Sequence, residues 1–203
     1  MPPRLVLASQ SPRRAQLLAM LGLQCEVAPA DIDETWPADE DPAAHAERLA
    51  REKAFAVADA AGGATDPDRL VIGSDTVVAL DGVVIGKPAD VDDAVRMLLG
   101  LQGRTHLVAT GIAIAANGRL LSEVECVRVH FRAFDERTAR AYVATGEPLD
   151  KAGAYGIQGY GSTLVDRIEG DFFAVMGFPI ARFIDLLARH GWRYDFRGLE
   201  RTT

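Results

Sequence analysis

Residues 70–80 read LVIGSDTVVAL, an apolar run with Ser74-Asp75-Thr76 in its middle. Leucine, isoleucine and valine in a run bounded by turn residues predict a strand that is buried on both faces. The next two residues, Asp81-Gly82, are a favoured hairpin turn, and residues 83–85 predict the strand that returns beside the first. A long strand in the middle of a sheet, with a hairpin at its end, is therefore the predicted framework of the fold.

Asp75 is the residue of this strand that needs an explanation. A carboxylate between Ile72 and Val77 is costly to bury unless it pairs with a cation, holds a metal or points into a cleft. We interpret Asp75 as a general base or a metal ligand. The alternative is an aspartate that bonds to the backbone at a bulge of the strand.

Toward the N-terminus, residues 5–8 read LVLA and predict a short buried strand. Ser11 is a suitable N-cap for the helix that follows, because its hydroxyl can accept a hydrogen bond from an amide one turn on. Pro12 takes the first helical position, where its missing N–H costs nothing, and Gly22 is the expected stop. These signals predict a strand, a short connection and a helix.

Arg13 and Arg14 lie in the first turn of that helix, where the helix dipole is already positive. An anion bound at this end would offset the repulsion. Together with the hydroxyls of Ser9 and Ser11 and the free amides of the first turn, the two guanidinium groups predict a phosphate-binding site. The alternative is a solvated helix start whose arginines form surface ion pairs.

The rest of the chain alternates between helix and strand signals, which predicts a mixed α/β fold. Gly62-Gly63 is expected to end the first of these helices, and Asn117-Gly118 to join two long strands. Residues 146–161 are too rich in glycine for a core element and predict tight bends or a close approach of the backbone to a ligand. The predicted helices span residues 42–61, 91–100, 135–145 and 179–190, and the predicted strands span 25–28, 106–116, 120–131 and 172–176.

Three lysines stand next to apolar or glycine residues. Lys53 lies within the apolar face of the first of these helices, Lys151 lies in the glycine-rich segment, and Lys87 follows the returning hairpin strand. Lys87 is therefore expected near Asp75, and a plain salt bridge between the two is one interpretation. The functional interpretation is that all three lysines converge on polyphosphate oxygens, because they would then share one anion.

An acidic loop, residues 31–35, follows the second predicted strand and reads DIDET. Carboxylate oxygens of this kind suit Mg²⁺ or Mn²⁺ next to a phosphate, and Glu34 is the candidate ligand. A solvated acidic loop is the alternative.

Composition limits the classes of function. The chain has 203 residues, of which 48% are hydrophobic and 25% charged, and we expect one globular domain over residues 1–203. Its net charge of −7, from 22 basic and 29 acidic side chains, argues against binding to nucleic acid over a broad surface. No segment reads as a signal peptide or a membrane span, and Cys25 and Cys126 have no metal or disulfide spacing. We therefore expect a cytoplasmic protein that binds a small anionic ligand, and neither nucleic acid nor membrane.

Several common catalytic motifs are absent from the sequence. It contains no P-loop, no dinucleotide-binding glycine fingerprint and no Gly-x-Ser-x-Gly elbow. The histidines have neither zinc nor triad spacing, and we expect all of them at the surface or at sheet edges: His45, His106, His130 and His190. Nucleophilic catalysis by serine or cysteine therefore has no support.

Five blocks of the sequence, spread over nearly its whole length, resemble the Maf family of nucleoside triphosphate pyrophosphatases, once described as septum formation inhibitors. Their order along the chain is also that of the family, which argues against chance similarity. The blocks read LASQSPRR (7–14), REKA (51–54), SDTVV (74–78), GKP (86–88) and EPLDKAGAYGIQG (147–159).

The resemblance implies a fold similar to that of the inosine triphosphate pyrophosphatases: a long twisted mixed sheet flanked by helices, with two lobes and a central cleft. It implies hydrolysis of the bond between the α- and β-phosphates of a nucleoside triphosphate, which yields a monophosphate and pyrophosphate. A divalent cation is expected to assist, Mg²⁺ first, with Mn²⁺ and Co²⁺ as alternatives. The resemblance further implies a homodimer.

The roles of the family carry over to the matching residues of this chain. Asp75 is implied as the proton acceptor, and Arg13, Thr76 and Gln158 match positions linked to selection of the base. Threonine after the aspartate resembles the branch that acts on dTTP and UTP, since the branch that prefers 7-methyl-GTP has glutamine there. The expected substrate-binding residues are Ser9, Ser11, Arg13, Arg14, Lys53, Thr76, Lys87, Lys151 and Gln158, and the expected metal ligands are Glu34 and Asp75.

We expect Arg13 to contact the substrate, whereas Arg14 has the alternative of a plain charge on the helix surface. Modified pyrimidine nucleotides are further candidate substrates. Two other functions stay open. The first is a nucleotide-binding regulator of cell division whose catalysis is incidental, although a pure binder has no need of the base Asp75. The second is an inosine triphosphate pyrophosphatase, which fold analogy alone supports.

Overall fold

The structure, a computed structural model, describes every residue except 1, 38, 61–65, 67 and 203. Among the described residues, seven strands form one mixed sheet in the order β2-β1-β3-β5-β6-β7, and β4 pairs with β3 beside this path. A separate hairpin joins β8 and β9. The strands are β1 (Arg4–Leu7), β2 (Cys25–Val27), β3 (Arg69–Leu80), β4 (Val83–Ile85), β5 (Thr105–Ala116), β6 (Arg119–Phe131), β7 (Val165–Glu169), β8 (Trp192–Tyr194) and β9 (Leu199–Arg201).

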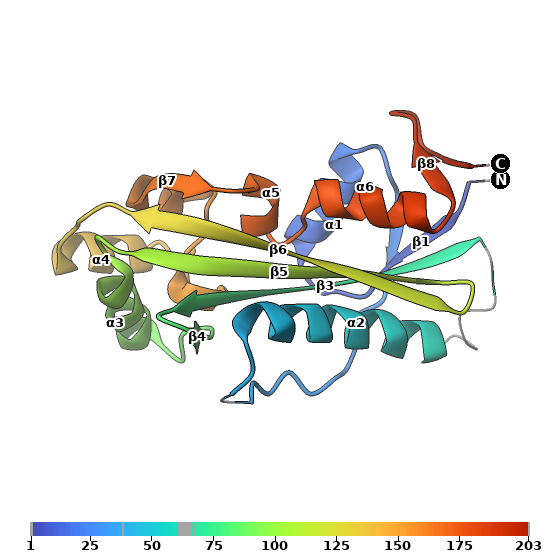
Figure 1. Cartoon of the computed structure of the whole chain (residues 1–203). Coiled ribbons are helices and arrows are strands. Elements are labelled where there is room, and N and C mark those ends of the chain that lie inside the picture. The colour runs from blue at the N-terminus through green and yellow to red at the C-terminus, as the bar shows by residue number, and fades with distance from the viewer. Residues whose placement is uncertain (1, 38, 61–65, 67, 203) are drawn as a thin grey trace.

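Helices cover both faces of this sheet. In Figure 1, α2 lies along one face, α1 and α6 lie over the other face near the two termini, and α3 and α4 lie at the opposite end. The helices among the described residues are α1 (Pro12–Met20), α2 (Pro42–Ala60), α3 (Val91–Leu101), α4 (Glu136–Val143), α5 (Phe172–Val175) and α6 (Ile180–Arg189), with 3₁₀ helices at Ala152–Ala154 and Gly159–Leu164.

One edge of β3 is open in the middle. β1 runs parallel to β3 as far as Leu7, which lies opposite Ile72, and β4 pairs with β3 only from Val78 onward. Residues 73–77 of β3 therefore have no described strand beside them on that edge, while β5 pairs with the other edge from Val71 to Ala79. The polar interruption Ser74-Asp75-Thr76 lies in this gap.

Helix α2 approaches the sheet very closely. A Cβ atom on Gly73 of β3 would lie 2.1 Å from the carbonyl oxygen of Ala50, and one on Gly111 of β5 would lie 2.2 Å from that of Ala46. These distances are too short for any side chain, so glycine is required where the helix crosses the two strands.

Alternation along β3 sends neighbouring polar side chains to opposite faces of the sheet. Asp75 shares the face of Gly73, which α2 covers. Ser74 and Thr76 share the other face, where the hydroxyl of Ser74 lies 2.9 Å from the carbonyl oxygen of Gly177, at the turn between α5 and α6. Groups from the helices on both faces of the sheet therefore lie beside the open edge of β3 at residues 73–77.

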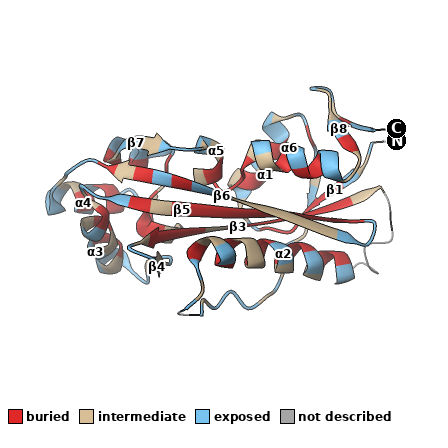
Figure 2. Cartoon of the chain, in the orientation of Figure 1, coloured by how far each residue is buried: buried red, intermediate tan, exposed pale blue. Residues whose placement is uncertain are grey.

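Two large apolar cores divide the molecule into two lobes. One gathers around α1, α6 and the β8–β9 hairpin and contains Phe183 and Trp192. The other gathers around α3, α4 and the start of β5 and contains Leu98 and Phe131. Because β3, β5 and β6 contribute to both cores, the sheet joins the lobes, and Figure 2 shows its middle strands buried between the helical layers.

The structure confirms the predicted mixed α/β fold and most of the predicted elements. Asp81-Gly82 and Asn117-Gly118 form the two predicted hairpin turns, with positive φ at both positions of each. Gly22 follows the end of α1 with a φ of 74°, as expected of a helix stop. Gly62-Gly63, the predicted end of α2, lies outside the described residues.

The predicted strand over residues 172–176 is wrong, because this segment forms the short helix α5. The carboxylate of Asp171 accepts a hydrogen bond from the backbone N–H of Phe173 at 2.8 Å and so caps the helix. An apolar run of this length fits a helix or a strand equally well, and the cap decides between them. Ser11 stands at the N-cap of α1, but its side chain makes no capping bond, so that part of the prediction is also wrong.

The short strands β7, β8 and β9 were not predicted. Each of these strands has few residues, and it pairs with another part of the chain or across a short turn. It is therefore too short to give the long alternating pattern that predicts a strand.

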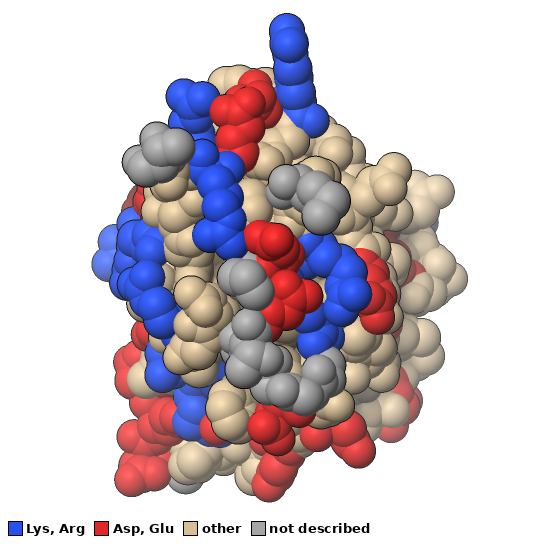
Figure 3. Space-filling model, turned by 90° about the vertical axis from the view of Figure 1, so that its right-hand side faces the viewer, with Lys and Arg blue, Asp and Glu red and all other residues tan. Residues whose placement is uncertain are grey.

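Charges of both signs are interspersed at the end of the molecule that carries the termini (Figure 3). Among them, Arg193 pairs with Glu200 and Arg201 with Asp68, each at 2.8 Å. None of the described helices combines the length and the apolar character that crossing a membrane requires.

Candidate functional site

A cavity of about 1120 Å³ opens at the gap in the edge of β3. Its walls come from the end of β1, the first turn of α1, helix α2, the middle of β3, the β4 hairpin and residues 147–159. All the residues that the sequence indicated for binding or catalysis line it: Ser9, Ser11, Arg13, Arg14, Glu34, Lys53, Asp75, Thr76, Lys87, Lys151 and Gln158. The structure thus brings these separate stretches of the chain together, while the role of each residue stays a prediction.

Asp75 meets Lys53 on the α2 side of the cavity. Nζ of Lys53 lies 2.6 Å from Oδ1 of Asp75 and 2.6 Å from Oε1 of Glu34. Lys53 and Asp75 are buried, whereas Glu34 is exposed. One ammonium group therefore links a carboxylate of the sheet to a carboxylate of the acidic loop.

The alternatives for Asp75 can now be decided. β3 pairs with β5 in unbroken register through Asp75, which lies opposite Gly111, so a bulge is excluded. The cation that contacts Asp75 is Lys53 of α2 rather than Lys87.

Arg14 is buried and joins three elements of the fold. Its Nε donates to the carbonyl oxygen of Gly177 at 2.8 Å, Nη1 donates to Oγ of Ser9 at 2.8 Å, and Nη2 donates to Oγ1 of Thr76 at 3.2 Å. Burial lowers the pKa of Arg14, and the charge of Asp75 opposes that shift. The alternative in which Arg14 is a plain charge on the helix surface is therefore wrong.

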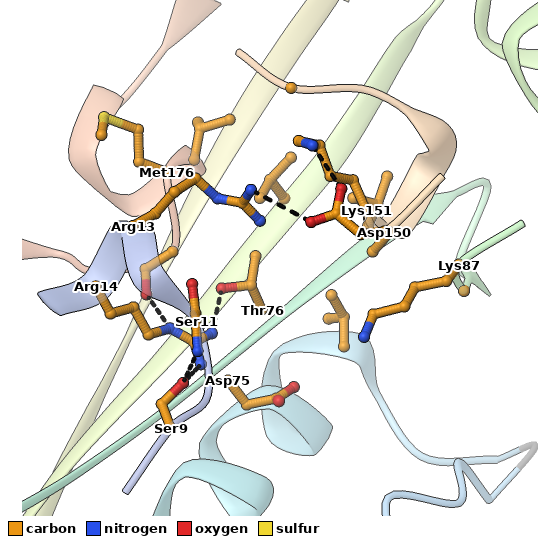
Figure 4. Close-up of a pocket in the computed structure, with 18 of the residues that line it drawn as sticks. Ser9, Ser11, Arg13, Arg14, Asp75, Thr76, Lys87, Asp150, Lys151 and Met176 are labelled. Carbon is orange, nitrogen blue, oxygen red and sulfur yellow. Dashed lines mark hydrogen bonds and ion pairs between the residues drawn. The ribbon is translucent and has the colours of Figure 1, made fainter. Parts of the chain in front are cut away.

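Arg13 extends into the cavity instead (Figure 4). Its Nη1 lies 3.8 Å from Oδ2 of Asp150, and its side chain is 33% exposed. Asp150 also pairs with Lys151, whose ammonium group bonds the backbone carbonyl of Glu147. Arg13 and Lys151 thus share a single exposed carboxylate, which leaves positive charge available to an anion.

Replacing Arg14 by methionine is expected to lower the free energy of unfolding by about 2–4 kcal/mol, because the change removes buried hydrogen bonds from a charged donor. Arg13→Met is the matched control, and it should change that free energy by about 0.5 kcal/mol or less, since an exposed ion pair contributes little. Urea unfolding followed by circular dichroism measures both values. Equal losses in the two variants would show that Arg14 does not hold the fold together as described.

Lys87 extends into the cavity from the end of the β4 hairpin (Figure 4). It is exposed, and no described residue forms an ion pair with it. The preceding residue is held in place, because the carbonyl oxygen of Gly86 accepts a hydrogen bond from the N–H of Gly153 at 3.0 Å. Lys87 is therefore a positioned cation without an internal counter-charge.

The charge of the cavity differs from that of the chain. Among the described lining residues are five basic side chains, against four acidic ones at Glu34, Asp75, Glu147 and Asp150. The protein as a whole carries a net charge of −7. A local excess of positive charge in an acidic protein favours a small anionic ligand at this place.

The residues that lead from the acidic loop to α2 are attached to that helix through Glu40, which the sequence analysis did not single out. Its carboxylate accepts hydrogen bonds from Arg48 at 2.8 and 2.9 Å and lies 2.6 Å from Nδ1 of His45. The indole N–H of Trp36 donates to the backbone carbonyl of Glu40 at 3.1 Å. Since Glu34 contacts α2 through Lys53, the loop is attached at two points, and Trp36 and His45 join the cavity lining.

The prediction that the histidines lie at the surface or at sheet edges is wrong for His45 and His106, which are 3% and 2% exposed. His106 packs between the rings of Phe131 and Tyr155, and its Nε2 lies 2.8 Å from the hydroxyl of Tyr155. Burial lowers the pKa of His106 to about 4. His106 had no local sequence signal, because its partners come from other elements. The partners of His45, Glu40 and Arg48, lie near it in the chain, but the sequence analysis did not single them out.

The anchor at Glu40 should make stability depend on pH. The hydrogen bonds from Arg48 lower the pKa of Glu40 from 4.5 to about 2, although burial acts in the opposite direction. Because the pKa is lower in the folded state, the stabilisation is complete above pH 4.5 and disappears as the pH falls toward 2. The urea midpoint of Glu40→Gln should therefore lie below that of the wild type at pH 7, and the gap should narrow from pH 4.5 downward. A difference between the two midpoints that stays constant from pH 4.5 downward would rule out the lowered pKa of Glu40 as its cause.

The residues matched to base selection lie on different walls of the cavity. Arg13 and Thr76 come from the α1 side, and Oγ1 of Thr76 is bonded to Arg14. Gln158 comes from the glycine-rich segment, where it is exposed at the N-terminus of the 3₁₀ helix Gly159–Leu164.

Known proteins include relatives of this chain that match it over most of its length. A sequence model of the family described as Maf-like protein matches residues 4–190. The dTTP/UTP pyrophosphatase of Moorella thermoacetica is 51% identical over 190 residues, which cover 93% of this chain and 95% of the relative. The proteins of the same name from Syntrophomonas wolfei and Chromobacterium violaceum are 46% and 44% identical, over 91% and 93% of this chain and 96% of each relative.

Proposed function

This chain belongs to the Maf family, and on that premise we propose that it is an enzyme that hydrolyses dTTP and UTP to the nucleoside monophosphate and pyrophosphate. The shared name of its relatives supports the substrates, and Thr76 supports the same branch of the family. The observation that carries the proposal is a carboxylate, Asp75, beside five basic side chains on the wall of one cavity. A polyanionic substrate requires the cations, and hydrolysis requires the base.

In the proposed reaction, Asp75 accepts a proton from a water molecule whose oxygen forms a bond to the α-phosphorus. The bond from that phosphorus to the oxygen that bridges to the β-phosphate breaks, and pyrophosphate leaves with the electron pair. Lys53 holds Asp75 through Oδ1, and Oδ2 has no bond to a described residue. We therefore assign Oδ2 as the oxygen that accepts the proton from water.

The triphosphate chain is assigned to the cations that are least neutralised within the protein. Lys87 has no ion-pair partner among the described residues, and Arg13 and Lys151 share Asp150. Arg14 bonds both Ser9 and Thr76 and so holds the first turn of α1 against β3, and residues of that turn line the same cavity.

A divalent cation, Mg²⁺ before Mn²⁺ or Co²⁺, is part of the proposal. Glu34 and Asp75 fit such an ion, because their carboxylate oxygens converge on one cationic atom, Nζ of Lys53. Mg²⁺ uses one or two carboxylates of a protein and takes phosphate and water oxygens as well. When bound, the cation would neutralise negative charge on the phosphates.

Selection of the pyrimidine is assigned to Gln158, with Arg13 and Thr76. A glutamine amide both donates and accepts, so it can pair with the carbonyl and the N–H of a uracil or thymine ring. Modified pyrimidine nucleotides that keep these two groups are candidate substrates on the same ground.

The proposal has three remaining parts. A homodimer rests on the family resemblance, and a single domain over residues 1–203 and a cytoplasmic location rest on the length, the composition and the segment patterns of the sequence. Sedimentation velocity at micromolar concentration tests the dimer, since a monomer at that concentration would remove it from the proposal.

Pyrophosphate release from a panel of nucleoside triphosphates tests the function. We expect the highest kcat/KM for dTTP and UTP, lower values for CTP, ITP and 7-methyl-GTP, and loss of activity after chelation of divalent cations. Binding of UTP without hydrolysis of any substrate would favour the nucleotide-binding regulator instead. A preference for ITP would favour the inosine triphosphate pyrophosphatases.

A further inference from the structure

The glycines of residues 156–161 lie close to other groups of the protein. A Cβ atom on Gly159, whose φ is +67°, would lie 2.5 Å from Oε2 of Glu147. One on Gly161 would lie 2.3 Å from the carbonyl oxygen of Gly156 and 2.6 Å from the hydroxyl oxygen of Tyr142, and one on Gly156 would lie 3.2 Å from Cε of Lys151 and 3.3 Å from Oε1 of Glu147. The sequence predicted tight bends or an approach of this backbone to a ligand, and the side chains that lie close to these glycines include Glu147 and Tyr142.

The carboxylate of Glu147 accepts three hydrogen bonds around this segment. Oε1 accepts from the N–H of Gly161 at 3.0 Å and from the hydroxyl of Tyr142 at 2.8 Å, and Oε2 accepts from the N–H of Tyr160 at 2.9 Å. The hydroxyl of Tyr142 in turn accepts from the N–H of Gly156 at 3.1 Å. The backbone is therefore held on both sides of Gln158.

The electrostatics of this network agree with its geometry. Burial raises the pKa of Glu147, but the hydrogen bonds from Gly161, Tyr160 and Tyr142 outweigh burial, and the net shift is downward. The pKa of Tyr142 is raised, chiefly by burial, so its hydroxyl keeps the proton that it donates to Glu147. Glu147 is thus a carboxylate, and only a carboxylate can accept all three of these bonds.

Gln158 itself has no such support. Its side chain is exposed, and no described residue forms a hydrogen bond with it. The place of its amide in the cavity is therefore decided by the backbone that carries it.

We propose that Glu147 is a positioning residue that sets the choice between uracil and cytosine, because its carboxylate fixes the backbone on either side of Gln158. This inference rests on the proposed function. Glu147 does not have to touch the base, and Tyr142 extends its action to the N-terminal side of Gln158.

The chemistry of the two bases explains why position matters here. At the edge where uracil presents a carbonyl acceptor, cytosine presents an amino donor. A glutamine amide carries both a donor and an acceptor, so an amide that is free to move can satisfy either base. Discrimination requires that the amide meets the ring in one place, and a small displacement of a binding group is known to have large kinetic effects.

Glu147→Gln is the decisive variant, because it keeps the size of the side chain but replaces one acceptor oxygen by an N–H donor. That donor would face a backbone N–H of Tyr160 or Gly161, while the backbone carbonyl that bonds Lys151 is unchanged. We expect the ratio of kcat/KM for UTP to kcat/KM for CTP to fall about tenfold, mainly through KM for UTP. Tyr142→Phe should lower the ratio in the same direction by a smaller factor, and Glu136→Gln, on the exposed side of α4, should leave it unchanged.

The possible outcomes separate the inference from the function on which it rests. A Glu147→Gln enzyme that is less stable but keeps the wild-type ratio would reduce Glu147 to a structural role and overturn the inference alone. A wild type that binds UTP but hydrolyses nothing would overturn the proposed function, and the ratio of dissociation constants for UTP and CTP, measured by calorimetry, would then decide the inference. A wild type that binds neither nucleotide would overturn both.

Discussion

Asp75→Asn is expected to lower kcat for UTP hydrolysis by about a thousandfold, the range in which removal of a general base falls. The variant keeps the size of the side chain and an oxygen that can accept the hydrogen bond from Lys53, but it loses the group that takes the proton from water. Pyrophosphate release under saturating UTP measures the loss. The dissociation constant of UTP should change much less than kcat, because Lys87, Arg13 and Lys151 are untouched.

Two controls make this result specific. Asp59→Asn removes an exposed carboxylate of the same kind from the far end of α2 and should leave kcat as in the wild type. Circular dichroism of Asp75→Asn should show a folded protein, since Lys53 keeps its second partner, Glu34. Activity of Asp75→Asn within a few-fold of the wild type would exclude Asp75 as the proton acceptor.

Gly73→Ala is expected to have the largest effect on stability, a loss of about 3 kcal/mol or more, at the upper end of the range for overpacked cores. The new Cβ would lie 2.1 Å from the carbonyl oxygen of Ala50 and 2.7 Å from the backbone N of Ala54. Both atoms belong to the backbone of α2, which cannot move aside as a flexible side chain would. The helix would have to lift from β3, and Lys53, one residue before Ala54, would move with it away from Asp75.

Gly100→Ala is the matched control for this change. Gly100 lies in α3, and a Cβ there would meet no atom within 4 Å. Alanine is the better helix former, so this variant should be more stable by about 0.5–1 kcal/mol. Thermal unfolding measures both proteins, and a Gly73→Ala variant as stable as Gly100→Ala would mean that α2 does not pack on β3 as the structure has it.

The candidate site was visible in the sequence because each of its charges stands in surroundings that do not suit a charge. Asp75 interrupts an apolar strand, Lys53 interrupts the apolar face of a helix, and Arg13 and Arg14 begin a helix at its positive end. Burial or repulsion of a charge is costly, so such positions indicate a partner. The family resemblance then joined these positions into one expected site.

The residues that contact these charged side chains in the fold could not be predicted from the sequence. Arg13 and Arg14 are neighbours with the same side chain, and the sequence analysis favoured Arg13 as the functional one. The fold buries Arg14, because the carbonyl of Gly177, 163 residues away along the chain, comes within 2.8 Å of it. The anchor between Glu40 and Arg48, eight residues apart, and the bonds of Glu147 to Tyr160 and Gly161, 13 and 14 residues away, were also missed, because no periodic pattern links such pairs.

The sequence by itself determined the mixed α/β fold, the long strands and helix α2, and the residue types of the site, because these depend on local periodicity and on the cost of a misplaced charge. Only the tertiary structure decided where the cavity lies, since the gap between β1 and β4 depends on which parts of β3 each strand pairs with. It also decided that Gly159 lies against the carboxylate of Glu147, because a contact between residues that are not near neighbours in the chain leaves no periodic trace in the sequence.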